Sequence, residues 1–270
     1  MKKLLFFLFI LLNNSLAKAE LIYIENLYKN SDKKSDPTIT KYYKGINSRA
    51  LIIFIPGGEG MFRFGPQKNE PTLSYYKMLK KISEKNITSG AYDLVLMDSP
   101  YSLGDGTFNQ IRFMRASSDH LYRIESVINF YKDKTKLPIL LMGHSNGGIS
   151  VMEFIDNIAK DSSKNNLLSG IIMSAARDEA NLFLKPAKLP VIFLHHKNDG
   201  CVGTTYKAAI FAFDKLLKEN NNVSFITVET GGPEGNLNAC NSGTHMYYGS
   251  SDEVPKKLDA VLNAISFKIN

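Results

Sequence analysis

The sequence has few of the features that mark a metal site, a nucleic-acid-binding surface or a membrane protein. Its only cysteines, Cys201 and Cys240, are far apart and form no C-x-x-C pair of the kind that binds zinc. Lysines and arginines are scattered without a dense basic run, so the net charge of +7 indicates a solvated basic surface and no nucleic-acid partner. No internal repeat is present, and no motif implies a metal or an organic cofactor.

The N-terminus has the pattern of a secretory signal peptide. A lysine pair precedes the apolar run Leu4–Leu12, and the small residues Ala17 and Ala19 stand at the two positions that a signal peptidase reads. This run is too short to cross a bilayer, which takes roughly 20 residues, and no later stretch is long enough. We therefore expect a signal peptide over residues 1–19 and a mature domain over residues 20–270, exported across the inner membrane to the periplasm. An oxidising compartment and an even number of cysteines favour a disulfide.

Short, continuous apolar runs recur along the mature chain and alternate with segments of helical pattern. Such runs are typical of strands buried on both faces of a parallel sheet. The predicted strands are Ala50–Pro56, Tyr92–Asp98, Pro138–Gly143, Leu168–Ser174, Leu189–His195 and Val223–Glu229. The predicted helices are Thr72–Lys85, Ser118–Lys132, Asn146–Lys160, Thr204–Glu219 and Val254–Phe267. The alternation predicts an α/β protein with a mostly parallel central sheet flanked by helices, and Thr38–Tyr43 and the residues around Tyr23 are candidates for antiparallel edge strands.

The strongest local motif is the sequence GHSNGG at residues 143–148, which follows a predicted strand and opens a predicted helix. A G-x-S-x-G sequence in this context is a nucleophile elbow, a sharp turn that exposes the serine hydroxyl at the carboxyl edge of the sheet. Glycines flank the serine because side chains there would collide with neighbouring backbone. We predict that Ser145 is a nucleophile and that the N–H of Asn146 contributes to an oxyanion hole. The alternative is an N-cap serine at a glycine-rich helix start.

A serine nucleophile needs a general base, and the sequence offers five histidines. His245 lies in a glycine-rich loop after the last predicted strand, so it follows the serine and the candidate acid in the chain. His144 lies inside the elbow, His120 lies on the preceding helix, and the pair at 195–196 ends a predicted strand. We therefore predict that His245 is the base.

The carboxylate that orients this histidine should follow a strand between Ser145 and His245. Asp199 does so, in the sequence HHKND after the strand LPVIFL. The Asn-Asp-Gly sequence around it is also a common turn, so a purely structural role is the alternative. Asp98 and Glu229, each at the end of another predicted strand, are rival acids.

A second glycine-rich loop, PGGEG at residues 56–60, follows the first predicted strand. Glycines let the backbone approach a substrate closely, so this loop is the candidate for the second oxyanion donor, with Gly58 first and Glu59 next. A dinucleotide-binding G-x-G-x-x-G loop is excluded because its last position here is Arg63.

On these motifs the sequence resembles the α/β-hydrolase superfamily, and more narrowly a poorly characterised group of secreted bacterial serine α/β hydrolases. The segments that carry the resemblance are IFIPGGEG, MDSP, RASSDHLYRI, GHSNGG, HHKNDGC and GG…AC…GTH. The resemblance implies the α/β-hydrolase fold, a Ser145–Asp199–His245 triad and a disulfide between Cys201 and Cys240. It implies no particular substrate. The sequence departs from the family pattern at Pro56, directly before the first glycine of the PGGEG loop, where many esterases have histidine.

The expected activity is hydrolysis of an ester or a related acyl bond in a small-molecule or acyl substrate, through an acyl-enzyme intermediate. A peptidase or a thioesterase would use the same residues. An inactive hydrolase fold that serves as a binding protein is the alternative from another class, and the oligomeric state is not indicated.

The sequence leaves little chain for a cap over the site. Only residues 174–188 separate two strands where many lipases insert one, so residues 61–71 and 101–116 are the remaining candidates for a cover. Three arginines lie in or beside these segments: Arg63, Arg112 and Arg115. They could bind an anionic substrate, and the alternative is that they are exposed to solvent or pack against the protein.

Overall fold

The computed structural model describes residues 19–28, 36–68, 70, 74–185, 189–232, 239–240 and 243–267. The predicted signal peptide lies outside these residues, except for Ala19. Among the described residues, no helix combines the length and the apolar character that a membrane span requires.

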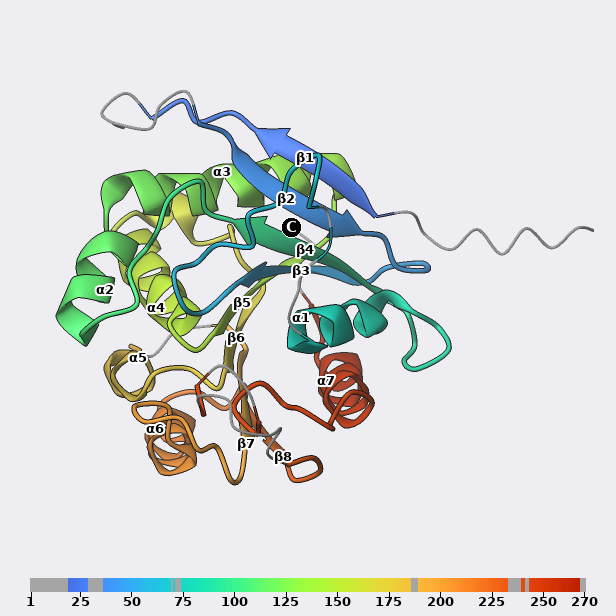
Figure 1. The fold of residues 1–270 in the computed structure, drawn as a ribbon, viewed down its shortest axis with the longest axis vertical. Helices are drawn as coiled ribbons and strands as arrows, with labels where there is room; N and C mark the ends of the chain where they lie inside the picture. The colour runs from blue at the N-terminus through green and yellow to red at the C-terminus, as the bar shows by residue number, and fades with distance from the viewer. Residues whose placement is uncertain are drawn as a thin grey trace, which may run out of the picture.

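One eight-stranded sheet forms the centre of the molecule (Figure 1). Its order is β1-β2-β4-β3-β5-β6-β7-β8. The strands are β1 (Glu20–Ile24), β2 (Thr38–Tyr43), β3 (Ala50–Ile55), β4 (Tyr92–Asp98), β5 (Ile139–His144), β6 (Gly170–Ser174), β7 (Val191–His196) and β8 (Val223–Val228). Strands β3 to β8 are parallel to one another, whereas β2 pairs antiparallel with both β1 and β4 at one edge. The predicted α/β fold with a mostly parallel sheet is confirmed.

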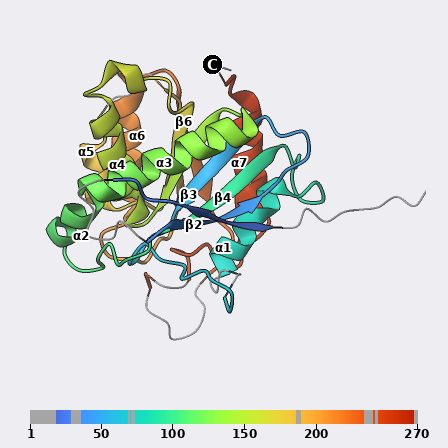
Figure 2. The same ribbon diagram turned by 90° about the horizontal axis from the view of Figure 1, so that it is seen from above.

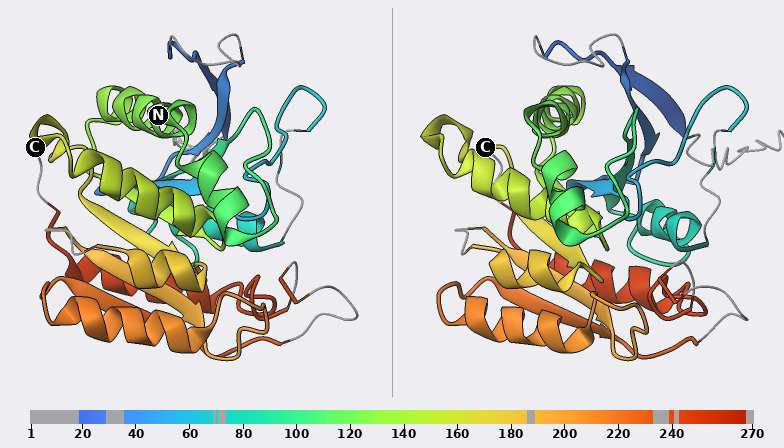
Figure 3. Two further views of the ribbon diagram at one scale, coloured as in Figure 1. Left: turned by 90° about the vertical axis from the view of Figure 1, so that its left-hand side faces the viewer. Right: turned by 60° about the vertical axis from the view of Figure 1, so that its left-hand side comes forward.

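Helices cover both faces of the sheet (Figure 2). They are α1 (Ser74–Leu79), α2 (Phe108–Arg115), α3 (Ser118–Thr135), α4 (Gly147–Ile158), α5 (Asp178–Phe183), α6 (Tyr206–Leu217) and α7 (Glu253–Ala264), with short 3₁₀ turns at Lys80–Ser83 and Ser162–Lys164. Apolar residues of α2 to α6 pack in one core, and those of α1 and α7 pack in a second. Figure 3 shows α6 and α7 on opposite sides of β7 and β8.

Side chains along each strand point alternately to the two faces of the sheet, and each face is covered by one of the two cores. In β3, Leu51, Ile53 and Ile55 point into the first core, and Ile52 and Phe54 point into the second. Successive side chains of a strand point to opposite faces, so a strand covered on both sides is apolar throughout.

The topology reverses direction at β3, and this reversal marks the position of the site. The chain proceeds from β3 to β4 on one side, and then to β5 on the other side of β3. In open α/β sheets, a crevice forms outside the carboxyl ends of the strands at such a switch point. The PGGEG loop follows β3 and the GHSNGG turn follows β5, so both loops border that crevice.

Candidate active site

Ser145 lies at the turn between β5 and α4 in a strained backbone conformation. Its φ is +54°, a region that non-glycine residues rarely adopt and that costs on the order of 1–3 kcal/mol. The neighbouring glycines make the turn possible. A Cβ on Gly143 would lie 2.3 Å from the Gly147 oxygen, and a Cβ on Gly147 would lie 2.2 Å from the Ile55 oxygen. The geometry is that of the predicted elbow.

The loop after β3 lies directly against this serine. A Cβ on Gly57 would lie 2.7 Å from the Ser145 Cβ, so only glycine allows this approach. Gly58 has a φ of +52° and open space where a Cβ would be. Asn146 donates its side-chain amide to the Gly58 oxygen over 3.3 Å, which ties the elbow to the loop. The two predicted oxyanion residues are therefore in contact with each other.

His245 and Asp199 form a buried hydrogen-bonded pair. The His245 Nδ1 lies 2.9 Å from the Asp199 Oδ2, and both side chains are at most 1 % exposed. On the opposite side of the ring, Nε2 of His245 is buried and has no hydrogen-bond partner among the described residues. A histidine with this arrangement has Nδ1 bound to the carboxylate and Nε2 available to take a proton.

Ser145 and His245 line the same pocket, which has a volume of about 250 Å³. No hydrogen bond joins them here, and serine-to-base contacts are often long in ligand-free enzymes. The lining residues are Gly57, Gly58, Glu59, Met61, Phe62, Arg63, Lys68, Tyr76, His144, Ser145, Cys240, His245 and Met246. Of the two segments expected to cover the site, residues 61–71 contribute to this lining and residues 101–116 do not.

Asp199 accepts more hydrogen bonds than the sequence suggested. Its Oδ1 accepts from the Cys201 N–H over 2.9 Å, and its Oδ2 accepts from the Thr204 hydroxyl over 3.2 Å. The Nε2 of His195 lies 3.1 Å from the same Oδ2 and 2.9 Å from the Thr204 carbonyl oxygen, so this nitrogen must carry the proton. Burial alone would raise the pKa of Asp199, but the hydrogen bonds from His195 and His245 hold it well below its usual value.

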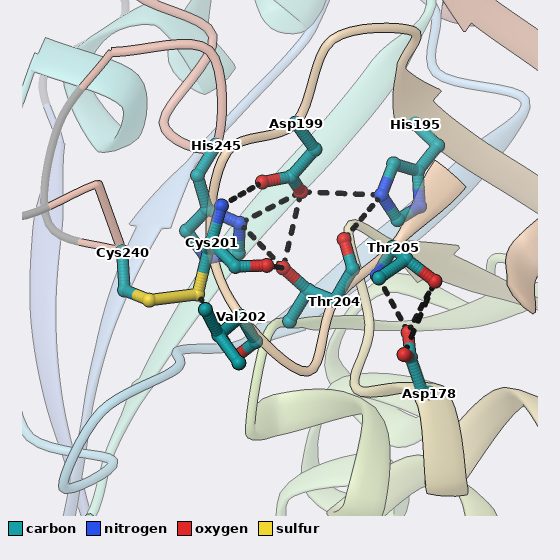
Figure 4. Close-up of a disulfide and its surroundings, with 9 residues drawn as sticks. All are labelled: Asp178, His195, Asp199, Cys201, Val202, Thr204, Thr205, Cys240 and His245. Atoms are coloured by element: carbon teal, nitrogen blue, oxygen red, sulfur yellow. Dashed lines mark hydrogen bonds and ion pairs between the residues drawn. A yellow bond between two sulfur atoms is a disulfide. The ribbon is translucent and has the colours of Figure 1, made fainter. Parts of the chain in front are cut away.

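His195 was not among the predicted site residues, and only its position at the carboxyl end of a strand hinted at it. Its contact with Asp199 depends on a turn of four residues that brings the acid back over the strand end. Figure 4 shows Asp199 between His195 and His245.

The remaining sequence candidates have other partners. Asp98 accepts the backbone N–H groups of Phe62 and Phe64 over 2.6 and 2.7 Å, so it anchors the loop that lines the pocket. Burial raises the pKa of this carboxyl, and the backbone hydrogen bonds offset only part of that effect. Glu229 is exposed and lies 3.5 Å from the Lys197 ammonium. Neither side chain contacts His245 in the described part of the chain.

The other histidines are packed in the interior. The His144 ring lies 4.9 Å from the His245 ring, centre to centre, and burial holds the His144 pKa well below its usual value. His120 contacts the Ser150 hydroxyl over 2.9 Å. His196 contacts the Thr230 carbonyl oxygen over 3.1 Å.

A disulfide joins Cys201 to Cys240, as the resemblance implied (Figure 4). Cys201 lies two residues after Asp199, and Cys240 lies five residues before His245 and lines the pocket. The bond therefore links the loop that carries the acid to the loop that carries the histidine.

The three arginines near the site have protein partners. Arg63 lies 2.9 Å from Glu59, and Arg112 lies 2.5 Å from Glu153. Arg115 is fully buried beneath the PGGEG loop. No group of three or more histidine, cysteine, aspartate or glutamate side chains is arranged to hold a metal ion within the described ranges.

No protein-family model and no curated protein sequence matches this chain. Solved structures do match. An α/β serine hydrolase without a lid from Xanthomonas campestris superposes with a TM-score of 0.59 at 8 % identity, over 92 % of this chain and 94 % of that one. A dienelactone hydrolase from Anabaena variabilis superposes with a TM-score of 0.54 at 10 % identity, over 92 % of this chain and 95 % of that one. An esterase from Pyrococcus furiosus superposes with a TM-score of 0.51 at 10 % identity, over 79 % of this chain and 83 % of that one.

At such low sequence identities, a structural match establishes the fold, and the chemistry has to be inferred from the residues of the site. In these matches the likeness extends over most of both chains, and here the elbow follows a strand at the switch point of the sheet. The chain therefore has the α/β-hydrolase fold.

Proposed function

We propose that this protein is a serine hydrolase that cleaves a carboxylic ester or a related acyl bond. The observation that carries the proposal is the orientation of His245. Its Nδ1 is bound to a buried carboxylate, while its Nε2, which has no partner in the described part of the chain, and the strained Ser145 border one pocket. Among the structures of similar fold are an esterase and a lactone hydrolase, and both names agree with acyl chemistry.

The chemical steps follow from these positions. The Ser145 Oγ attacks the acyl carbon and transfers its proton to Nε2 of His245, while the carbonyl electrons move to the oxygen. The backbone N–H groups of Gly58 and Asn146 stabilise this oxyanion. Collapse of the intermediate expels the alcohol, which takes the proton from His245, and leaves an acyl-enzyme. Water activated by the same nitrogen then releases the acid.

Asp199 keeps the base in its active tautomer throughout. The carboxylate accepts the Nδ1–H of His245 and stabilises the imidazolium that forms when Nε2 gains a proton. The additional hydrogen bonds from Cys201, Thr204 and His195 hold the carboxylate in one orientation.

The test is covalent labelling and turnover with a single substitution. Ser145→Ala should lower kcat/KM for p-nitrophenyl acetate by roughly 10³-fold or more and abolish labelling by a fluorophosphonate probe. Ser163→Ala, at an exposed 3₁₀ turn, is the matched control and should change neither. Equal labelling of the folded wild-type and Ser145→Ala proteins would contradict the assignment. An unlabelled and inactive wild type would favour the binding-protein alternative.

We also propose that residues 1–19 are removed on export, and that the mature protein is periplasmic. The disulfide supports this, because such bonds persist mainly in oxidising compartments. Mass spectrometry of the protein recovered from the periplasm should give Glu20 as the first residue.

A further inference from the structure

Arg115 is a buried cation without a counterion in the described part of the chain. It ends α2, its side chain is fully buried, and no described carboxylate lies within ion-pair distance of it. Burial lowers the pKa of this guanidinium to about 9. An unpaired buried charge is costly, so a charge retained at such a place points to a functional role.

The guanidinium donates to three neutral oxygens. One nitrogen donates to the Ser150 hydroxyl on α4 over 2.8 Å. The other donates to the Gly58 carbonyl oxygen over 3.0 Å and to the Pro56 carbonyl oxygen over 3.4 Å. A single side chain therefore holds two peptide groups of the PGGEG loop against the helix that begins at the elbow.

These contacts determine the direction of the loop N–H groups. In a trans peptide, the C=O of one residue and the N–H of the next point to opposite sides, and no described peptide bond is cis. Arg115 binds the carbonyls of Pro56 and Gly58, and the Gly60 N–H binds the carbonyl of Gly57 over 2.9 Å. The N–H groups of Gly57, Gly58 and Glu59 consequently point away from these partners.

Other contacts hold the second half of the loop, where the N–H groups of Leu103 and Ser99 bind the carbonyl oxygens of Glu59 and Gly60 over 2.8 and 3.1 Å. Its first half has no anchoring side chain. Gly57 and Gly58 have no side chain with which to anchor it, and Gly58 is exposed. Pro56 carries no side-chain donor that could bind a neighbouring carbonyl. A flexible loop loses catalytic power because an oxyanion hole works only when its donors are already oriented.

We propose that Arg115 is a positioning residue for the oxyanion hole. Its planar fork holds the Pro56 and Gly58 carbonyls away from the pocket, so that the Glu59 N–H, which shares a peptide group with the Gly58 carbonyl, faces the developing negative charge. The Gly58 N–H beside it is oriented by the turn in which the Gly60 N–H binds the Gly57 carbonyl. Its positive charge, placed behind these peptide groups, also stabilises an oxyanion in front of them. This inference rests on the proposed serine hydrolase function.

The test compares Arg115→Gln, which removes the charge and most donors, with Arg112→Gln on the same helix. Arg112 is half-exposed, binds Glu153 and lines no part of the pocket, so its variant should match the wild type. Arg115→Gln should lower kcat for p-nitrophenyl acetate by about 10²- to 10³-fold, as expected for lost oxyanion stabilisation, and change KM by less than about threefold. Fluorophosphonate labelling of Ser145 should slow in parallel.

Arg115→Lys is the second variant, and it decides the outcome if the glutamine variant does not fold. It keeps the charge, but a single ammonium lacks the planar fork that spans both carbonyls and Ser150, so kcat should fall at least roughly tenfold. A folded Lys or Gln variant with kcat within threefold of the wild type would overturn the proposal, and so would a loss that appears only in KM. If Ser145→Ala retains wild-type turnover, the serine hydrolase function itself fails, and the role of Arg115 fails with it.

Discussion

Asp199 shows how the surroundings of one side chain define its chemical state. Burial and hydrogen bonding oppose each other at this carboxyl, and hydrogen bonding prevails, so its pKa lies below the usual value of 3.8. A carboxylate with a lowered pKa stabilises the folded state above its unfolded pKa and loses that contribution as the pH falls through the folded pKa. The Asp199 carboxyl should therefore stay ionised at neutral and mildly acidic pH.

Asp199→Asn should lower kcat/KM for p-nitrophenyl acetate by roughly 10³- to 10⁴-fold at neutral pH while the protein stays folded. The amide cannot hold the active tautomer of His245 in the way that a carboxylate does. Steady-state kinetics and thermal melting on the same preparation measure both effects.

Asp98→Asn is the comparison variant. Its carboxylate anchors two backbone N–H groups of the pocket loop, so its loss should cost about 1–3 kcal/mol of unfolding free energy and less of the activity. If Asp98→Asn removes activity and Asp199→Asn does not, the acid has been assigned to the wrong strand.

At the scale of elements, the disulfide adds a covalent link between two loops that follow paired strands and that otherwise meet only through hydrogen bonds among the described residues. One loop follows β7 and carries the acid, and the other follows β8 and carries the histidine. The bond closes a segment with a sequence separation of 39 residues, and a chain-entropy argument gives it about 4 kcal/mol of stabilisation.

Reduction should therefore lower esterase activity at a reductant concentration or temperature at which the sheet is still folded. The chain has no other cysteine, so dithiothreitol acts on this bond alone. Activity and far-ultraviolet circular dichroism, measured along one titration, separate the two events. The double variant Cys201→Ser/Cys240→Ser should be less active and insensitive to the reductant. Simultaneous loss of activity and structure would argue that the bond stabilises the fold as a whole.

The sequence predicts the strands better than the helices because burial on both faces leaves an uninterrupted apolar run. The six predicted runs each correspond to one of β3 to β8 within two residues. Helix α2 is not among the predicted helices: it has only eight residues, and its apolar residues are unevenly buried, with Ile111 buried and Phe113 78 % exposed. Within the described residues, the predicted helix Thr72–Lys85 is α-helical over Ser74–Leu79 and continues as a 3₁₀ segment over Lys80–Ser83.

For the site, too, the sequence predicts some features and misses others. The elbow depends on glycines that lie close together in the chain, so their spacing is sufficient to indicate Ser145 as the candidate nucleophile. The contacts of Asp199 with His195 and of Arg115 with the PGGEG loop have no comparable signature in the sequence. The first contact depends on the conformation of a local turn, and the second joins residues 57 positions apart, which only the fold brings together.

At the scale of the whole molecule, the site has little cover. Between β6 and β7, the described residues contain only the six-residue helix α5. The pocket is lined by residues at or beyond the ends of β3, β5 and β8 and by Tyr76 of α1. We therefore expect that no large segment must move before a substrate enters.

The rate of hydrolysis of p-nitrophenyl butyrate should rise smoothly and saturate as its concentration passes the solubility limit. A lipase with a mobile lid, measured alongside, should show a sharp increase at that limit because the interface opens its lid. A similar jump for this protein would mean that a segment closes over the site in solution.

The disulfide between Cys201 and Cys240 also bears on when the protein would become active. On the proposed route, the chain would first reside among the reducing thiols of the compartment in which it is made. The loops of Asp199 and His245 would then lack their covalent link. Full activity would arise only after translocation and oxidation, so the enzyme would be largely latent in the compartment where it is made. The producing cell's own esters would be spared without an inhibitor or a removable propeptide.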